Sequence, residues 1–138
     1  MSQVSYTEEW RNRIDAFLSK NLPTGARVTD RATFDAIYDA FPGYLLFCFC
    51  ENYRRKNATP WQSFEGFAPA HLRLIEKHHW LPEQVFALSE DQLLLLLHHD
   101  LIAVKLPLDA HQLIEKYFQH HGIHDLKLAP PDVNSPPQ

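Results

Sequence analysis

The chain has 138 residues, 45% of them hydrophobic and 22% charged, and this balance predicts a folded globular protein rather than a disordered one. Its formal net charge of −4 argues against nonspecific binding to nucleic acid, which depends on lysine and arginine side chains that neutralise phosphates. No apolar stretch reaches the ~18–20 residues that cross a bilayer, and the N-terminal segment lacks the features of a secretory signal. We therefore expect a cytoplasmic protein with no membrane partner.

Two helices are predicted in the first third of the chain. The serine at Ser5 stands at the start of a capping box, and the apolar spacing that follows it predicts an amphipathic helix over residues 6–20. Asp30 has a side chain suited to cap a second helix. We expect the pair Pro42-Gly43 to end that helix, because proline and glycine are the residues that most often interrupt one.

Residues 44–50 read YLLFCFC, and seven consecutive apolar residues fit a buried helix as well as a buried strand. The aromatic residues lean toward a strand, whereas the three cations at 54–56 would be favourable at the C-terminus of a helix, so we predict a helix. Cys48 and Cys50 lie in this run. We expect both to be small buried hydrophobic residues in a reducing compartment, without a bond between them.

The following stretch predicts a loop and two helices. Proline, glycine and serine residues between 57 and 66 are typical of a loop. The apolar spacing after it predicts a helix over residues 69–79, and Pro82 suits the start of a short helix that reaches Leu88.

The five leucines from Leu93 to Leu97 are expected to form the centre of the core. Ser89 and Gln92 have the spacing of a capping box, which predicts that a helix begins there. Five leucines in a row cover every face of that helix, so we expect it to be buried on all sides. At ~1.5–3 kcal/mol for each fully buried leucine, the run would supply about 10 kcal/mol of gross stabilisation.

The C-terminal part predicts one more helix and a tail. Asp109 has a side chain suited to cap this helix, and Gly122 is expected just past its end. Residues 129–138 read APPDVNSPPQ, which is typical of a disordered proline-rich tail. We therefore predict a mostly α fold: one compact domain over residues 1–128 with five to seven short helices and at most a few short strands.

The sequence contains no glycine-rich phosphate loop and no Gly-x-Ser-x-Gly motif, so we find no catalytic constellation. By elimination we predict a small protein-binding or regulatory module without catalytic activity and without a cofactor. Its partner would be another protein, and the chain itself would be a monomer or a homodimer. Large aromatic residues near proline and glycine are the partner-binding candidates: Trp61, Phe64, Phe67 and Trp80.

The nine histidines, which include three adjacent pairs, suggest a further alternative. Neighbouring residues on a helix point about 100° apart, so an adjacent pair does not chelate one ion by itself. Imidazole changes its charge near pH 6.5, which allows a pH-responsive protein. A histidine-based pH-responsive or metal-binding protein therefore stays open as an alternative.

One histidine pattern points to an enzyme. His99-Asp100 follows the leucine-rich segment and precedes another apolar segment. This resembles the His-Asp pair of the HD-domain phosphohydrolases, all-helical enzymes in which these residue types hold a divalent metal. The resemblance implies a metal-dependent phosphohydrolase with His99 and Asp100 as catalytic residues. The metal ligands that it implies are His71, or one of His78 and His79, together with His99, Asp100 and Asp125. The competing interpretation is that these residues end a buried helix and satisfy its free carbonyl groups.

Overall fold

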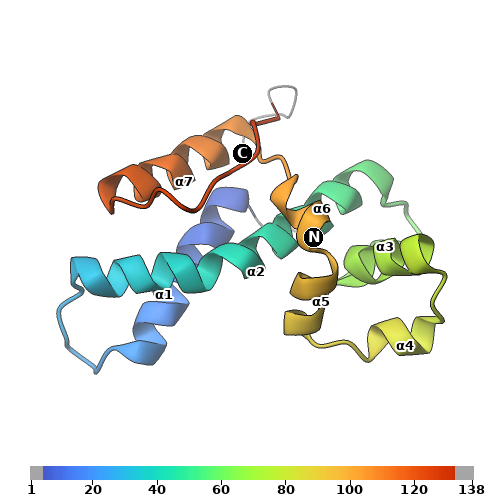
Figure 1. The fold of residues 1–138 in the computed structure, drawn as a ribbon, viewed down its shortest axis with the longest axis horizontal. Helices are drawn as coiled ribbons and strands as arrows, with labels where there is room; N and C mark the ends of the chain where they lie inside the picture. The colour runs from blue at the N-terminus through green and yellow to red at the C-terminus, as the bar shows by residue number, and fades with distance from the viewer. Residues whose placement is uncertain (1–4, 133–138) are drawn as a thin grey trace. The chain divides into compact units, whose positions relative to one another are not determined.

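The computed structural model describes residues 5–132, and within this range it contains seven helices and only two isolated β-bridges (Figure 1). The prediction of a mostly α fold with five to seven helices is therefore confirmed. The helices are α1 (Tyr6–Asn21), α2 (Asp30–Asn57), α3 (Ala68–His78), α4 (Pro82–Phe86), α5 (Glu90–Leu96), α6 (His98–Ile102) and α7 (Leu108–His120).

The described residues divide into two units. One spans Leu45–Val104, and the other holds the residues before and after it. Because α2 runs through both units, the single domain over residues 1–128 stays a prediction. Residues 133–138 of the predicted tail lie outside the described residues. Within residues 5–132, no helix combines the length and the apolar character that spanning a bilayer requires.

An aromatic cluster lies in the core of the unit that combines residues 5–44 with residues 105–132. Trp10 of α1 is fully buried, and its ring makes edge contacts with Tyr44 of α2 at 5.2 Å and Tyr117 of α7 at 5.7 Å. The Tyr44 hydroxyl donates a hydrogen bond of 2.8 Å to the Tyr6 carbonyl. These contacts join α1, α2 and α7, since large aromatic rings bury much surface and prefer edge-to-face geometry.

Helix α2 continues without interruption through Pro42 and Gly43, so the predicted helix end at this pair is wrong. Proline inside a helix removes one backbone hydrogen bond and costs about 3 kcal/mol. Pro42 is exposed, whereas the apolar residues on both sides of it, such as Ile37 and Leu46, are fully buried. Their burial outweighs the cost of the proline. The predicted helix over residues 44–50 is confirmed as part of α2.

Side-chain caps fix two helix starts where the sequence predicted them. The Ser5 side chain accepts a hydrogen bond of 3.4 Å from the Glu8 amide at the start of α1. At the start of α5, the Gln92 amide donates to the Ser89 side chain at 3.2 Å. The Ser89 amide in turn donates to the Gln92 side chain at 2.8 Å. This reciprocal pair is the predicted capping box.

The other two predicted caps are wrong, by one residue at α2 and by two residues at α7, where Pro107 is the cap. At the start of α2, Thr29 is the cap: its side chain accepts a hydrogen bond of 3.1 Å from the Ala32 amide, and Asp30 is already helical. Helix α7 begins at Leu108, so Asp109 lies in its first turn, where a carboxylate interacts favourably with the helix dipole. Gly122 follows the end of α7 with a φ of 67°, as predicted.

The leucine run is not buried on every face, so this prediction is wrong. Leu93 and Leu97 are fully buried, but Leu95 is 76% exposed. The run lies in a short helix, α5, which ends at Leu96 before α6 begins at His98. Only one face of this helix is covered. Leu93 and Leu97 are four residues apart and share the covered face, whereas Leu95 lies on the opposite side.

We expect Leu93→Ala to lower the free energy of unfolding by roughly 2–5 kcal/mol, because it leaves a cavity under a fully buried side chain. Leu95→Ala is the matched control in the same helix and should change stability by no more than about 0.5 kcal/mol. Urea denaturation followed by circular dichroism measures both. Equal losses in the two variants would contradict the observed burial pattern.

Candidate functional site

The segment between α2 and α3 carries the most exposed of the large apolar side chains that the structure describes. Trp61 is 85% exposed. Burying an indole ring stabilises a fold strongly, and the isolated chain does not gain this stabilisation from Trp61. Single exposed hydrophobic residues are common on protein surfaces, so exposure alone says little. What distinguishes Trp61 is how firmly its backbone is held.

A four-residue turn fixes the backbone on both sides of Trp61. The Thr59 amide donates to the Gln62 carbonyl at 2.9 Å, and the Gln62 amide donates to the Thr59 carbonyl at 3.2 Å. Pro60 restricts the φ angle just before Trp61. The Gln62 side chain then accepts a hydrogen bond of 3.1 Å from the Phe64 amide. The position of the tryptophan is therefore defined by hydrogen bonds within the loop.

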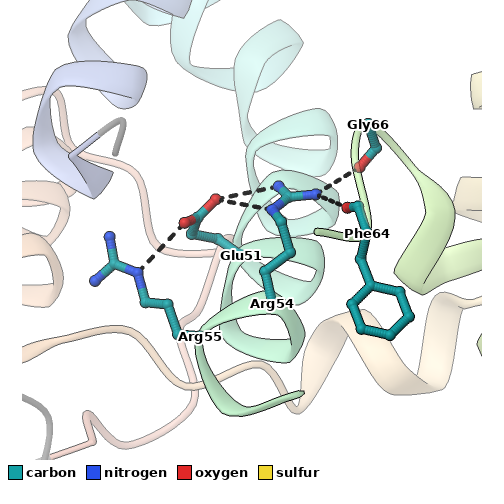
Figure 2. Close-up of polar contacts among 5 residues, drawn as sticks. All are labelled: Glu51, Arg54, Arg55, Phe64 and Gly66. Carbon is teal, nitrogen blue, oxygen red and sulfur yellow. Dashed lines mark hydrogen bonds and ion pairs between the residues drawn. The ribbon is translucent and has the colours of Figure 1, made fainter. Parts of the chain in front are cut away.

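Arg54 of α2 ties this loop to the helix (Figure 2). Its Nη1 donates to the Phe64 carbonyl at 2.8 Å and to the Gly66 carbonyl at 2.7 Å. Phe64 has a φ of 55° and Gly66 a φ of 61°. A positive φ is open to glycine but costs about 1–2 kcal/mol for phenylalanine, so the contacts of Phe64 must offset backbone strain. The Phe64 ring also packs edge-on against Tyr53 of α2, with 5.1 Å between ring centres.

Glu51 orients the guanidinium group that makes these contacts. Its carboxylate is almost completely buried and accepts from Arg54 twice, from Nε at 3.3 Å and from Nη2 at 3.1 Å. Arg55 approaches the other carboxylate oxygen through its Nε at 3.3 Å, on the opposite side of Glu51 in Figure 2. Both bonds from Arg54 end on Oε2 of Glu51, so one edge of the guanidinium faces a single carboxylate oxygen. Glu51 therefore sets the direction in which Arg54 reaches the loop.

The structure places the four predicted partner-binding residues differently. Trp61 is exposed, Phe64 and Phe67 are half-buried, and Trp80 lies after α3 with 36% of its side chain exposed. Sequence reasoning missed Glu51 and Arg54 as parts of this site. The signal was present in the spacing Glu51-x-x-Arg54-Arg55, which is the (i, i+3) and (i, i+4) spacing of helical ion pairs.

The residues that the HD-domain resemblance implies have other contacts. Asp100 accepts a hydrogen bond of 3.2 Å from Nε of Arg73, and Asp125 accepts one from the Tyr38 hydroxyl. His99 is exposed. No group of three or more histidine, cysteine, aspartate or glutamate side chains converges on a possible metal position within residues 5–132.

Both cysteines are buried and unbonded to each other, as predicted. Burial raises the pKa of the Cys50 thiol from 9.0 to about 11, although the Ala70 backbone and Arg54 oppose the shift. Because the thiolate is the nucleophilic form of cysteine, this environment disfavours thiol catalysis at Cys50.

Comparison with known proteins adds no assignment: no protein-family model, curated protein or solved structure matches this chain. The loop that presents Trp61 is the candidate functional site of this chain.

We expect Arg54→Gln to loosen this loop, because the substitution removes the ion pair with Glu51 and two bonds to loop carbonyls. Hydrogen exchange at the Thr59 and Gln62 amides should accelerate, and the free energy of unfolding should fall by about 1–3 kcal/mol. Arg31→Gln is the matched control, since Arg31 pairs with Asp35 on the exposed face of the same helix. It should leave both quantities nearly unchanged. Unchanged exchange in Arg54→Gln would show that the arginine does not hold the loop.

Stability should also depend on the protonation of His71. Burial lowers the pKa of His71 below its usual 6.5, so the unfolded chain takes up a proton first as the pH falls. Neutral His71 therefore contributes to the free energy of unfolding above about pH 6.5. This contribution is lost as the pH falls toward the lower pKa of the folded state. We expect the unfolding free energy of His71→Gln to fall less than that of the wild type between about pH 7 and pH 5. A pH profile of His71→Gln that is identical in shape to that of the wild type would refute this role for His71.

Proposed function

We propose that this protein is a small protein-binding module without catalytic activity, and that Trp61 anchors its partner. The observation that carries the proposal is a tryptophan that is 85% exposed on a loop held by Arg54. Tryptophan is among the residues that contribute most to binding energy at protein interfaces. The module would act on a partner protein by contact alone.

Preorganisation supports this assignment. A binding loop loses affinity when it has to be ordered on association. Here the turn at Thr59 and Gln62 and the bonds from Arg54 order the loop before any partner arrives. Burying the indole against a partner would then stabilise the complex, because the ring is not buried in the isolated chain.

A protein suits this anchor better than a small molecule. Small-molecule sites are concave and enclose most of the ligand. A cavity of about 570 Å³ lies against α7, and its lining residues include Tyr117 and His120 but none from residues 58–67. Trp61 instead stands out from its loop, which favours insertion into a pocket of the partner. The net charge of −4 supports a protein rather than nucleic acid as that partner.

The cytoplasm is the compartment that we propose for this module. Neither Cys48 nor Cys50 forms a disulfide, which suits a reducing environment. The protein would act there as a monomer or a homodimer.

We expect Trp61→Ala to reduce binding of the partner at least about 10-fold, because hot-spot tryptophans typically contribute 2 kcal/mol or more, roughly 30-fold in affinity. The full chain is immobilised, proteins that it captures are quantified by mass spectrometry, and the affinity of each candidate is then measured with the purified protein. Trp61→Phe should retain part of the affinity. Val28→Ala is the control, since Val28 is an exposed apolar residue of the other unit. If every captured protein binds wild type and Trp61→Ala equally, Trp61 is not the anchor.

A further inference from the structure

A second apolar surface lies where α4 packs along α3 (Figure 1). His71 and His78 are seven residues apart on α3 and therefore share one face of that helix. Phe86 makes an edge contact with His71 at 5.0 Å, and Trp80 stacks on His78 at 4.5 Å. The chain thus turns back after α3 and lays two aromatic rings along the same face.

The outer side of this segment is apolar and uncovered within the described residues. Val85 is the buried residue of α4. Leu81 and Phe86 are 62% and 60% exposed, and Trp80 is more than one-third exposed. We call Trp80, Leu81, Glu83 and Phe86 the α3–α4 ridge.

The chain holds the ridge in a defined conformation. His79 has a φ of 57°, an uncommon angle for a residue other than glycine, and this reverses the chain after α3. The Leu81 amide donates a hydrogen bond of 3.1 Å to the Gln84 side chain at the start of α4. Three large apolar side chains are therefore presented on a short, fixed segment.

The charged residue of the α3–α4 ridge is Glu83, and the sequence that follows it is acidic. From residue 78 to residue 104 the sequence contains no lysine and no arginine. Glu83, Glu90 and Asp91 are exposed in this stretch, and the structure gives none of them an ion pair within residues 5–132. Asp100 pairs with Arg73, and the nearest lysine before the stretch is Lys77. A complementary partner surface is therefore apolar and positively charged.

We propose that the α3–α4 ridge binds a basic amphipathic helix of a partner protein. The apolar stripe of such a helix would cover Trp80, Leu81 and Phe86, and a lysine or arginine beside the stripe would face Glu83. A second copy of the chain fits less well, because a symmetric contact through this ridge would bring like charges together. An added strand does not fit, because the ridge has a helical backbone and offers no sheet edge. The ridge goes beyond the function proposed for Trp61 and does not depend on it.

A designed peptide tests the proposal directly. The probe is a dye-labelled amphipathic helix of about 18 residues built from leucine and lysine, and its counterpart replaces every lysine with glutamate. Fluorescence anisotropy with the full chain should show saturable binding of the leucine–lysine peptide. We expect binding of the leucine–glutamate peptide to be at least about 10-fold weaker.

Variants separate the ridge from general attraction between charges. Leu81→Ser should weaken binding of the leucine–lysine peptide about 10-fold, and it should preserve the fold because serine is favoured at this helix-capping position. Glu83→Gln should weaken binding more at low salt than at high salt. Leu108→Ser, at an exposed apolar residue of the other unit, and Trp61→Ala should both bind as wild type does.

Three results would overturn the proposal. One is equal affinity of wild type and Leu81→Ser for the leucine–lysine peptide, since the attraction would then be purely electrostatic. Another is equal binding of the leucine–lysine and leucine–glutamate peptides, which would show that charge complementarity does not contribute to binding. The third is a dimer of the chain alone in analytical ultracentrifugation that Leu81→Ser dissociates, because a second copy would then occupy the ridge.

Discussion

The ion pair between Glu51 and Arg54 is the interaction on which the candidate site depends. A carboxylate that is nearly buried needs partners, and two arginines of the same helix supply them. Since Arg54 also bonds two loop carbonyls, the charge that satisfies Glu51 is the same charge that orders the loop. Arg54 therefore anchors the segment that carries Trp61 to helix α2. This couples the local stability of α2 to the position of the exposed indole.

The Trp61 loop and the α3–α4 ridge expose apolar surface by different means. Hydrogen bonds from an arginine hold the loop, whereas aromatic contacts with His71 and His78 hold the ridge. In both places the backbone adopts positive φ at a residue other than glycine, Phe64 in the loop and His79 before the ridge. Conformations of this kind persist only when surrounding contacts determine them. Both surfaces are consequently defined in shape before a partner binds.

Local patterns in the sequence were sufficient for some helix ends. The capping box of Ser89 and Gln92 and the position of Gly122 were predictable, because each depends on residues within one or two turns. The predicted end of a helix at Pro42 was wrong because the preference of a proline is weaker than the burial of the residues around it. The predicted burial of the whole leucine run was wrong for a related reason. A sequence pattern shows which residues are apolar, but only the packing of neighbouring helices shows which faces are covered.

The same division holds for the candidate site. The sequence by itself determined that the chain is helical, where α1 and α5 begin, and that an aromatic residue at 61 stands in a loop with proline and glycine. Only the tertiary structure decided that Trp61 is exposed while Phe64 packs on Tyr53, and that Arg54 reaches across twelve residues to the Gly66 carbonyl. Helix formation depends on neighbours along the chain, whereas exposure and long side-chain bonds depend on which distant segments meet in space.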